Sequence, residues 1–155
     1  MNKLQTKKGF TIIEVVLVLA IAGLIFLMVF LALPALQRSQ RDTQRKNDLS
    51  RVQSAINSFQ ANRRGAIPTL AEANGALVNE YLRSNNDQFE DPSGKGYTFV
   101  QGDPVGNYNT NERNNQIQYA IGSVCNGNGL TGNQGGRKVA LRMQLEGGGT
   151  YCLNN

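Results

Sequence analysis

The sequence predicts an α+β protein in which one long N-terminal helix packs on a small antiparallel β-sheet. Residues 15–36 form a run of 22 residues without a charge, long enough for a single apolar helix. A polar segment follows directly, and at residues 49–59 it carries an apolar stripe with helical spacing. The last third of the 155-residue chain alternates short apolar runs with glycine-rich turns, which is typical of antiparallel strands.

The apolar run has the length of a membrane span. At about 1.5 Å per residue, its 22 residues reach about 33 Å, enough to cross a hydrocarbon core of about 30 Å. Glu14 lies at its start, although a carboxylate costs about 2.5–3.5 kcal/mol at the centre of a bilayer and less near the surface. The simplest alternative, a plain membrane anchor, gains nothing from this carboxylate. Glu14 is therefore a candidate functional residue, with an amine as its expected partner.

The residues before the apolar run are basic. Lys3, Lys7 and Lys8 lie in a leader without an apolar stretch, whereas a secretory signal peptide has its apolar segment before the cleavage site. Here the apolar segment follows Gly9. Cleavage between Gly9 and Phe10 would leave the apolar helix on the mature protein and create a new amine on Phe10.

Residues 8–14, Lys-Gly-Phe-Thr-Ile-Ile-Glu, and the helix behind them resemble the type IV pilin superfamily, which includes type IV pilins and the pseudopilins of type II secretion. The resemblance implies that prepilin peptidase cleaves after Gly9 and methylates the amine of Phe10. It implies that Glu14 pairs with the Phe10 amine of a neighbouring subunit and that the apolar helices bundle in a filament core. The likeness is strong from Lys7 to about Pro68 and general beyond.

We expect four segments along the chain: a prepilin leader (1–9), a transmembrane or filament-core helix (10–36), an amphipathic continuation of that helix (37–64) and a globular β-sheet head (65–155). The continuation carries an apolar stripe of Leu49, Val52, Ile56 and Phe59, and Gly65 suits its end. Its other face mixes cations and carboxylates, which predicts a solvated surface or, alternatively, pairing between subunits of a filament. These charged residues are Arg38, Arg41, Asp42, Arg45, Lys46 and Asp48.

The remaining elements follow from turn residues and alternation. Residues 71–82 read as a short helix with Thr69 as its cap, and residues 102–116 and 125–136 read as loops. The clearest half-buried strand is 139–145, and the triple glycine after it predicts a hairpin. The expected strands are 97–101, 117–124, 139–145 and 150–153.

Cys125 and Cys152 are the two cysteines of the chain. In a small exported domain they suggest one disulfide, which would stabilise the fold by roughly 3–4 kcal/mol; two free buried thiols are the alternative. The resemblance agrees, because pilins commonly close a C-terminal loop in this way. Two cysteines without any histidine cannot supply the four ligands of a zinc site.

The sequence indicates no enzyme and no cofactor. Without a histidine, no histidine-based triad is available, and the glycine clusters lack the context of a phosphate loop. The four acidic residues between Asp87 and Asp103 could collect a calcium ion, but their spacing matches no calcium loop, so we expect no metal site. These acidic residues are Asp87, Glu90, Asp91 and Asp103.

Nucleic-acid binding is not expected. The formal charge of the whole chain is +5, but the leader contributes three of the 16 basic residues, so the mature chain would carry only +2. A small basic patch of Arg137, Lys138 and Arg142 beside Tyr151 is possible for DNA, but such residues more often solubilise an exposed strand.

We expect a structural subunit of a type IV pilus that polymerises through its N-terminal helix into a surface filament for adhesion, motility or DNA uptake. Its expected partners are other copies of itself, prepilin peptidase, the pilus assembly platform and, before assembly, the membrane. The alternative is a major pseudopilin of a type II secretion system. A membrane-anchored enzyme or receptor is disfavoured by Glu14 and the leader.

Two signals conflict on orientation. More Lys and Arg follow the apolar run than precede it, and the positive-inside rule would therefore place the C-terminal domain inside. We give more weight to the peptidase implied by the resemblance, which acts at the cytoplasmic face, and to the cysteine pair, which suits an oxidising exterior. The expected protein is single-pass in the cytoplasmic membrane with its head outside, and is later part of an extracellular pilus.

Overall fold

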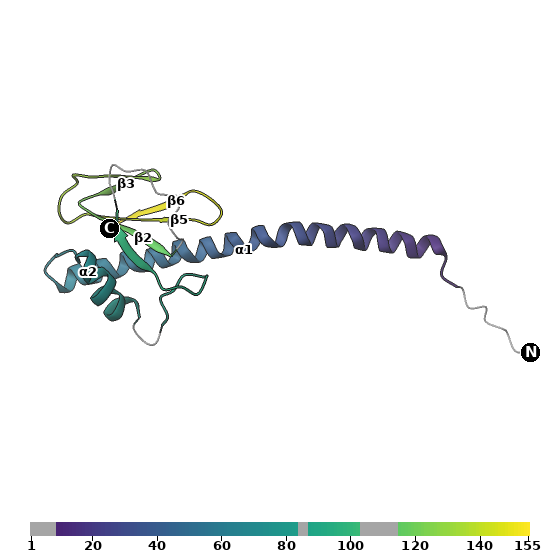
Figure 1. The fold of residues 1–155 in the computed structure, drawn as a ribbon, viewed down its shortest axis with the longest axis horizontal. Helices are drawn as coiled ribbons and strands as arrows, with labels where there is room; N and C mark the ends of the chain where they lie inside the picture. The colour runs from purple at the N-terminus through teal and green to yellow at the C-terminus, as the bar shows by residue number, and fades with distance from the viewer. Residues whose placement is uncertain (1–8, 84–86, 103–114) are drawn as a thin grey trace, which may run out of the picture. The chain divides into compact units, whose positions relative to one another are not determined.

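The computed structural model of the chain describes residues 9–83, 87–102 and 115–155. Two compact units are present, Met1–Gln37 and Arg38–Asn155, and helix α1 (Ile12–Asn62) contributes to both. The second unit contains the sheet and two short helices (Figure 1), which confirms the predicted α+β class. Its other elements are α2 (Leu70–Glu72), the π-helix η1 (Ala73–Leu82), β1 (Thr98–Gln101), β2 (Gln116–Ile121), β3 (Val124–Asn126), β4 (Gly129–Thr131), β5 (Val139–Gln144) and β6 (Thr150–Asn154).

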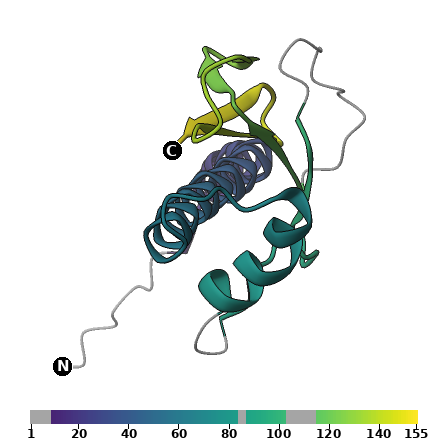
Figure 2. The same cartoon turned by 90° about the vertical axis from the view of Figure 1, so that its left-hand side faces the viewer.

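The predicted apolar stripe of α1 forms the centre of the core. Leu49, Val52 and Ile56 are fully buried and Phe59 is 2% exposed. In the view along α1, the sheet lies above the helix and η1 lies beside it (Figure 2), and all three contribute to one hydrophobic cluster. These four side chains are buried together because side chains three and four positions apart share one face of a helix.

The predicted helix at residues 71–82 is present and starts at Leu70. Thr69 caps it as expected: its hydroxyl accepts from the Glu72 N–H, and the Glu72 carboxylate accepts from the Thr69 N–H at 2.8 Å, which makes a capping box. From Ala73 the helix widens into π geometry, with the Arg83 N–H donating to the Val78 carbonyl at 2.8 Å. Sequence patterning did not indicate this widening.

The main sheet is mixed, in the order β1-β2-β5-β6. β2, β5 and β6 pair antiparallel as expected, but the edge strand β1 pairs parallel to β2, with Phe99 opposite Ile117. A parallel pair requires a crossover longer than a hairpin turn, and the chain between these strands is long enough for one. The loop expected at 102–116 lies for the most part outside the described residues.

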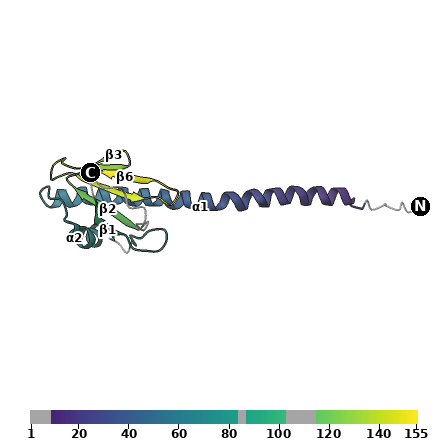
Figure 3. The ribbon, with the colours of Figure 1, turned by 45° about the horizontal axis from the view of Figure 1, so that its top comes forward.

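The prediction of a loop at 125–136 is wrong for the first half of that segment, because β3 and β4 pair there as a second, two-stranded sheet. The strand expected at 117–124 ends at Ile121, where Gly122 turns the chain with φ +70°. β3 lies on the side of the main sheet that faces away from α1 (Figures 1 and 3). Ala140 and Arg142 on β5 are consequently 0% and 3% exposed, so this strand is buried on both faces instead of half-buried.

Candidate functional site

The apolar part of α1 is the most exposed hydrophobic surface of the described chain. All exposed large hydrophobic side chains except Ile121 belong to residues 10–36. Within the described residues, α1 is the one helix whose length and apolar composition suffice to cross a membrane, and none of its most apolar window is buried. Water-exposed apolar surfaces of this extent mark contact with lipid or protein.

The start of this helix has a defined geometry. Gly9 and Phe10 precede the first helical residue, Ile12, and Phe10 is 86% exposed. The Thr11 N–H and hydroxyl both donate to Glu14 Oε2, at 2.9 and 2.7 Å, and the Glu14 N–H donates to Thr11 Oγ1 at 3.4 Å. Thr11 and Glu14 thus form a capping box, which satisfies N–H groups that the first helical turn leaves unpaired.

The sequence analysis did not predict Thr11 as a hydrogen-bond partner of Glu14, although Thr-x-x-Glu before an apolar run is a recognised capping signal. Within the described residues, every hydrogen bond to the Glu14 side chain uses Oε2. Glu14 is an exposed residue, and its second carboxylate oxygen remains able to accept a donor from elsewhere.

The charged face of α1 is only in part the solvated surface expected for it: Arg38 and Lys46 are exposed, but Asp42, Arg45 and Asp48 are buried. Arg45 is only 1% exposed, and its guanidinium donates to both carboxylate oxygens of Asp91, at 2.6 and 3.1 Å. It also reaches Asp42 at 3.0 Å and Glu146 at 3.3 Å. We call these residues, with Arg41, which bonds Glu146 at 2.5 Å, the Arg45 cluster.

The Arg45 cluster holds two loops against α1. The carboxylate of Asp42 accepts the N–H groups of Glu146 and Gly147, both at 2.8 Å, and so anchors the hairpin between β5 and β6. A Cβ at Gly147 would come within 3.0 Å of Asp42 Oδ2, which explains the glycine there. Asp91 anchors the second loop, the turn at residues 91–94 that precedes β1, and its carboxylate accepts the Ser93 N–H at 2.9 Å.

The electrostatics of Asp91 follow from this geometry. Burial by itself would raise the pKa of the Asp91 carboxyl, but the hydrogen bonds from Arg45 and Ser93 outweigh it and hold the pKa below its ordinary value. Asp48 shows the opposite balance: burial raises its pKa more than the bonds from Tyr97 and Arg51 lower it. The carboxylates of this region are therefore engaged inside the fold.

The described residues contain no group of three or more potential metal ligands. Asp91 forms a salt bridge with Arg45, Asp87 forms one with Arg51, and Asp103 lies outside the described residues.

The candidate basic patch is not assembled as expected. Arg142 is buried and donates to Gln118 at 2.8 Å, while the Tyr151 ring lies under Lys46, 5.6 Å from its amine.

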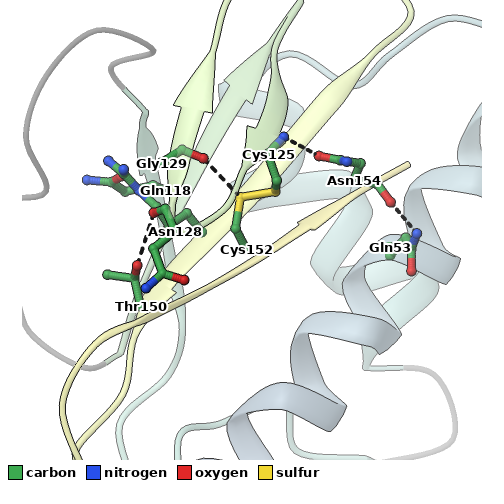
Figure 4. The surroundings of a disulfide bond; sticks show 9 residues. Gln53, Gln118, Cys125, Asn128, Gly129, Thr150, Cys152 and Asn154 are labelled. Atoms are coloured by element: carbon green, nitrogen blue, oxygen red, sulfur yellow. Dashed lines mark hydrogen bonds between the residues drawn. A yellow bond between two sulfur atoms is a disulfide. The ribbon is translucent and has the colours of Figure 1, made fainter.

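Cys125 and Cys152 form a disulfide, with a Cα–Cα distance of 5.8 Å. It joins β3 to β6 and therefore ties the two-stranded sheet to the main one (Figure 4). Asn154 accepts the Cys125 N–H at 2.6 Å through its side chain, and its carbonyl accepts the side-chain amide of Gln53 on α1. The disulfide and these bonds connect both sheets to α1.

Replacing both cysteines by serine should lower the free energy of unfolding of the head by about 3–4 kcal/mol, because the open chain gains loop entropy in the unfolded state. Thermal unfolding followed by circular dichroism in detergent measures this loss. The native chain unfolded with a reductant should show the same decrease. An unchanged midpoint in both samples would contradict a stabilising role of the disulfide.

Residues 4–30 match the family described as the prokaryotic N-terminal methylation motif. This motif is the signature of type IV prepilins and pseudopilins, and the chain carries it together with a long N-terminal helix and a small sheet. The match covers residues 4–30 alone; it supports a type IV pilin or pseudopilin, a structural type of subunit, and does not distinguish between the two. No curated protein and no solved structure matches the chain.

Proposed function

We propose that the chain is the structural subunit of a type IV pilus. The observation that carries this proposal is the methylation motif joined to a single carboxylate, Glu14, at the start of an otherwise uncharged and exposed apolar helix. Copies can cover these helices by packing them together, and burial of apolar surface then supplies the cohesion of the filament.

In this proposal, prepilin peptidase cleaves between Gly9 and Phe10 and methylates the new amine. Both residues precede the helix, so the bond lies in a non-helical segment. Residues 10–36 hold the protein in the cytoplasmic membrane with its head outside until the assembly platform adds it to the pilus. The second carboxylate oxygen of Glu14 then accepts a hydrogen bond from the Phe10 amine of a neighbouring copy, an attraction that is stronger in an apolar surrounding than in water. Head-to-tail contacts that do not close produce a helical filament.

A major pseudopilin of a type II secretion system is the second candidate. The turn that begins at Asp91-Pro92 and contains Gly94 resembles the pseudopilin turn, which favours this alternative. Ser93 replaces the aromatic residue of that turn, and the disulfide is more typical of pilins. Electron microscopy of sheared surface fractions from cells with and without the gene distinguishes the two. Loss of surface filaments with normal secretion supports the pilus, and normal filaments with impaired secretion support the pseudopilin.

Replacing Gly9 by leucine should leave the precursor uncut, because the larger side chain occupies the residue whose carbonyl carbon is attacked. Intact mass spectrometry of the membrane fraction measures the leader directly, and the native chain should begin at a methylated Phe10. Gly23→Leu is a matched control, since Gly23 lies inside the apolar helix with open space around it and should not affect cleavage. A mature product of unchanged mass from Gly9→Leu would contradict cleavage at this bond.

A further inference from the structure

Four exposed cations gather where α1 ends and β5 begins. We call them the basic tip: Arg63, Arg64, Arg137 and Lys138. The Gln60 side-chain amide donates to the Arg137 carbonyl at 3.4 Å. The Arg137 guanidinium carbon lies 3.8 Å from the point that a Cβ on Gly65 would occupy. The end of α1 and the start of β5, which are distant in sequence, thus meet at the basic tip.

No residue of the basic tip forms a salt bridge in the described part of the chain. The ion pairs there all involve Arg41, Arg45 or Arg51. Glu72 is an acidic neighbour: the pKa of its carboxyl is lowered mainly by hydrogen bonds from Thr69 and also by the charge of Arg63. Arg63 lies over the Phe59 ring, 5.3 Å from its centre. Four cations beside one carboxylate give this surface an excess of positive charge in the isolated subunit.

Arg64 adds a conformational cost. The Gly65 N–H donates to the Gln60 carbonyl at 2.7 Å, the long hydrogen bond of a Schellman motif. Arg64 occupies the left-handed position of this motif with φ +54°, where glycine is the usual residue. A cation near a helix C-terminus gains from the helix dipole, but that gain does not account for four cations together. Strained residues that persist often have a functional reason.

We propose that the basic tip binds the phosphate backbone of double-stranded nucleic acid, without regard to base sequence. Three of the four residues are arginines, whose planar guanidinium matches two phosphate oxygens at once. Such contacts release counterions and need no reading of bases. The expectation against nucleic acid rested on the low net charge of the mature chain, whereas binding depends on where the charges lie. The proposal does not depend on filament formation.

The test uses the full chain in a neutral detergent and a fluorescently labelled DNA duplex. Binding by the native chain should weaken with salt with a log–log slope of roughly −3 to −4 if all four residues contact phosphates. Arg64→Gln with Lys138→Gln should reduce that slope by about two and lower the affinity about tenfold or more at low salt.

A matched control removes the same charge elsewhere on the exposed surface, by Arg38→Gln with Lys95→Gln. Arg38 lies about 37 Å before Arg63 along α1, well beyond the Debye length of about 8 Å at physiological salt. The control should therefore bind almost as the native chain does. Equal losses in the two double variants would overturn the proposal, and so would failure of the native chain to bind duplex at low salt.

Arg64→Gly separates binding from folding. Glycine relieves the left-handed backbone and removes the cation, so this variant should bind DNA more weakly while its thermal midpoint stays equal or rises. Undiminished binding by Arg64→Gly would overturn a role for Arg64. A polyglutamate competitor that displaces DNA at equal charge concentration would show a surface without preference for phosphate, which also overturns the proposal.

Discussion

Cells that carry Glu14→Gln or Glu14→Val are expected to lose surface filaments while they still insert and cleave the precursor. The proposed contact between Glu14 and the Phe10 amine of the next copy needs a charge on both partners. Neither amide nor valine can supply it, and the amine would be left without a countercharge in an apolar filament core. Electron microscopy of sheared filaments and an immunoblot of the mature subunit in membranes measure the two outcomes.

The capping box provides a control that separates the two roles of Glu14. Glutamine at this position still caps the helix start, so Glu14→Gln removes the charge and keeps the cap. Thr11→Ala removes the threonine hydroxyl from the cap and keeps the carboxylate. We expect filaments with Thr11→Ala and none with Glu14→Gln. The reverse result would assign Glu14 to helix capping, and normal filaments in both Glu14 variants would refute the proposed contact between Glu14 and the Phe10 amine.

Arg45→Met should cost the head about 3–5 kcal/mol of folding free energy, the largest effect that we expect from a single substitution in it. Methionine fills much of the same volume but leaves Asp91, whose side chain is fully buried, without its cation. The thermal midpoint should fall by on the order of 10 °C. Arg41→Met is the matched control, because the Arg41 side chain is 34% exposed and its pair with Glu146 should contribute less than about 1 kcal/mol.

The pH dependence distinguishes an electrostatic loss from a packing loss. In the native head, the lowered pKa of Asp91 contributes stability that is present above its unfolded pKa of about 3.9 and is lost as the pH falls through the lower folded value. Without Arg45, burial should raise the pKa of the same carboxyl. The deficit of Arg45→Met should therefore shrink between pH 7 and about pH 4.

A double variant completes this test. Arg45→Met with Asp91→Asn leaves no buried charge at the centre of the cluster and should be more stable than Arg45→Met alone, so the two effects should not add. Equal deficits of Arg45→Met at both pH values, or a double variant as unstable as the sum of the single ones, would show that Arg45 acts through its volume and not its charge.

Local patterns accounted for much of the fold. The stripe from Leu49 to Phe59 was predicted because helix periodicity is a property of neighbouring residues, and the same holds for the cap at Thr69 and the last hairpin. The pairing of Cys125 with Cys152 followed because the chain has only two cysteines. The capping box of Thr11 and Glu14 has an equally local signal, the spacing Thr-x-x-Glu, although only an amine partner was predicted for Glu14.

The sequence by itself determined the candidate functional end of this protein: the proposed leader, the Gly9-Phe10 junction, Glu14 and the apolar helix are contiguous, and their interpretation depends on order and spacing alone. Only the tertiary structure decided which charges are buried, because Arg45 meets Asp91 and Glu146 across 46 and 101 residues of chain. The same applies to the parallel edge strand β1, to the second sheet and to the basic tip. Contacts between distant segments depend on packing, which no local period encodes.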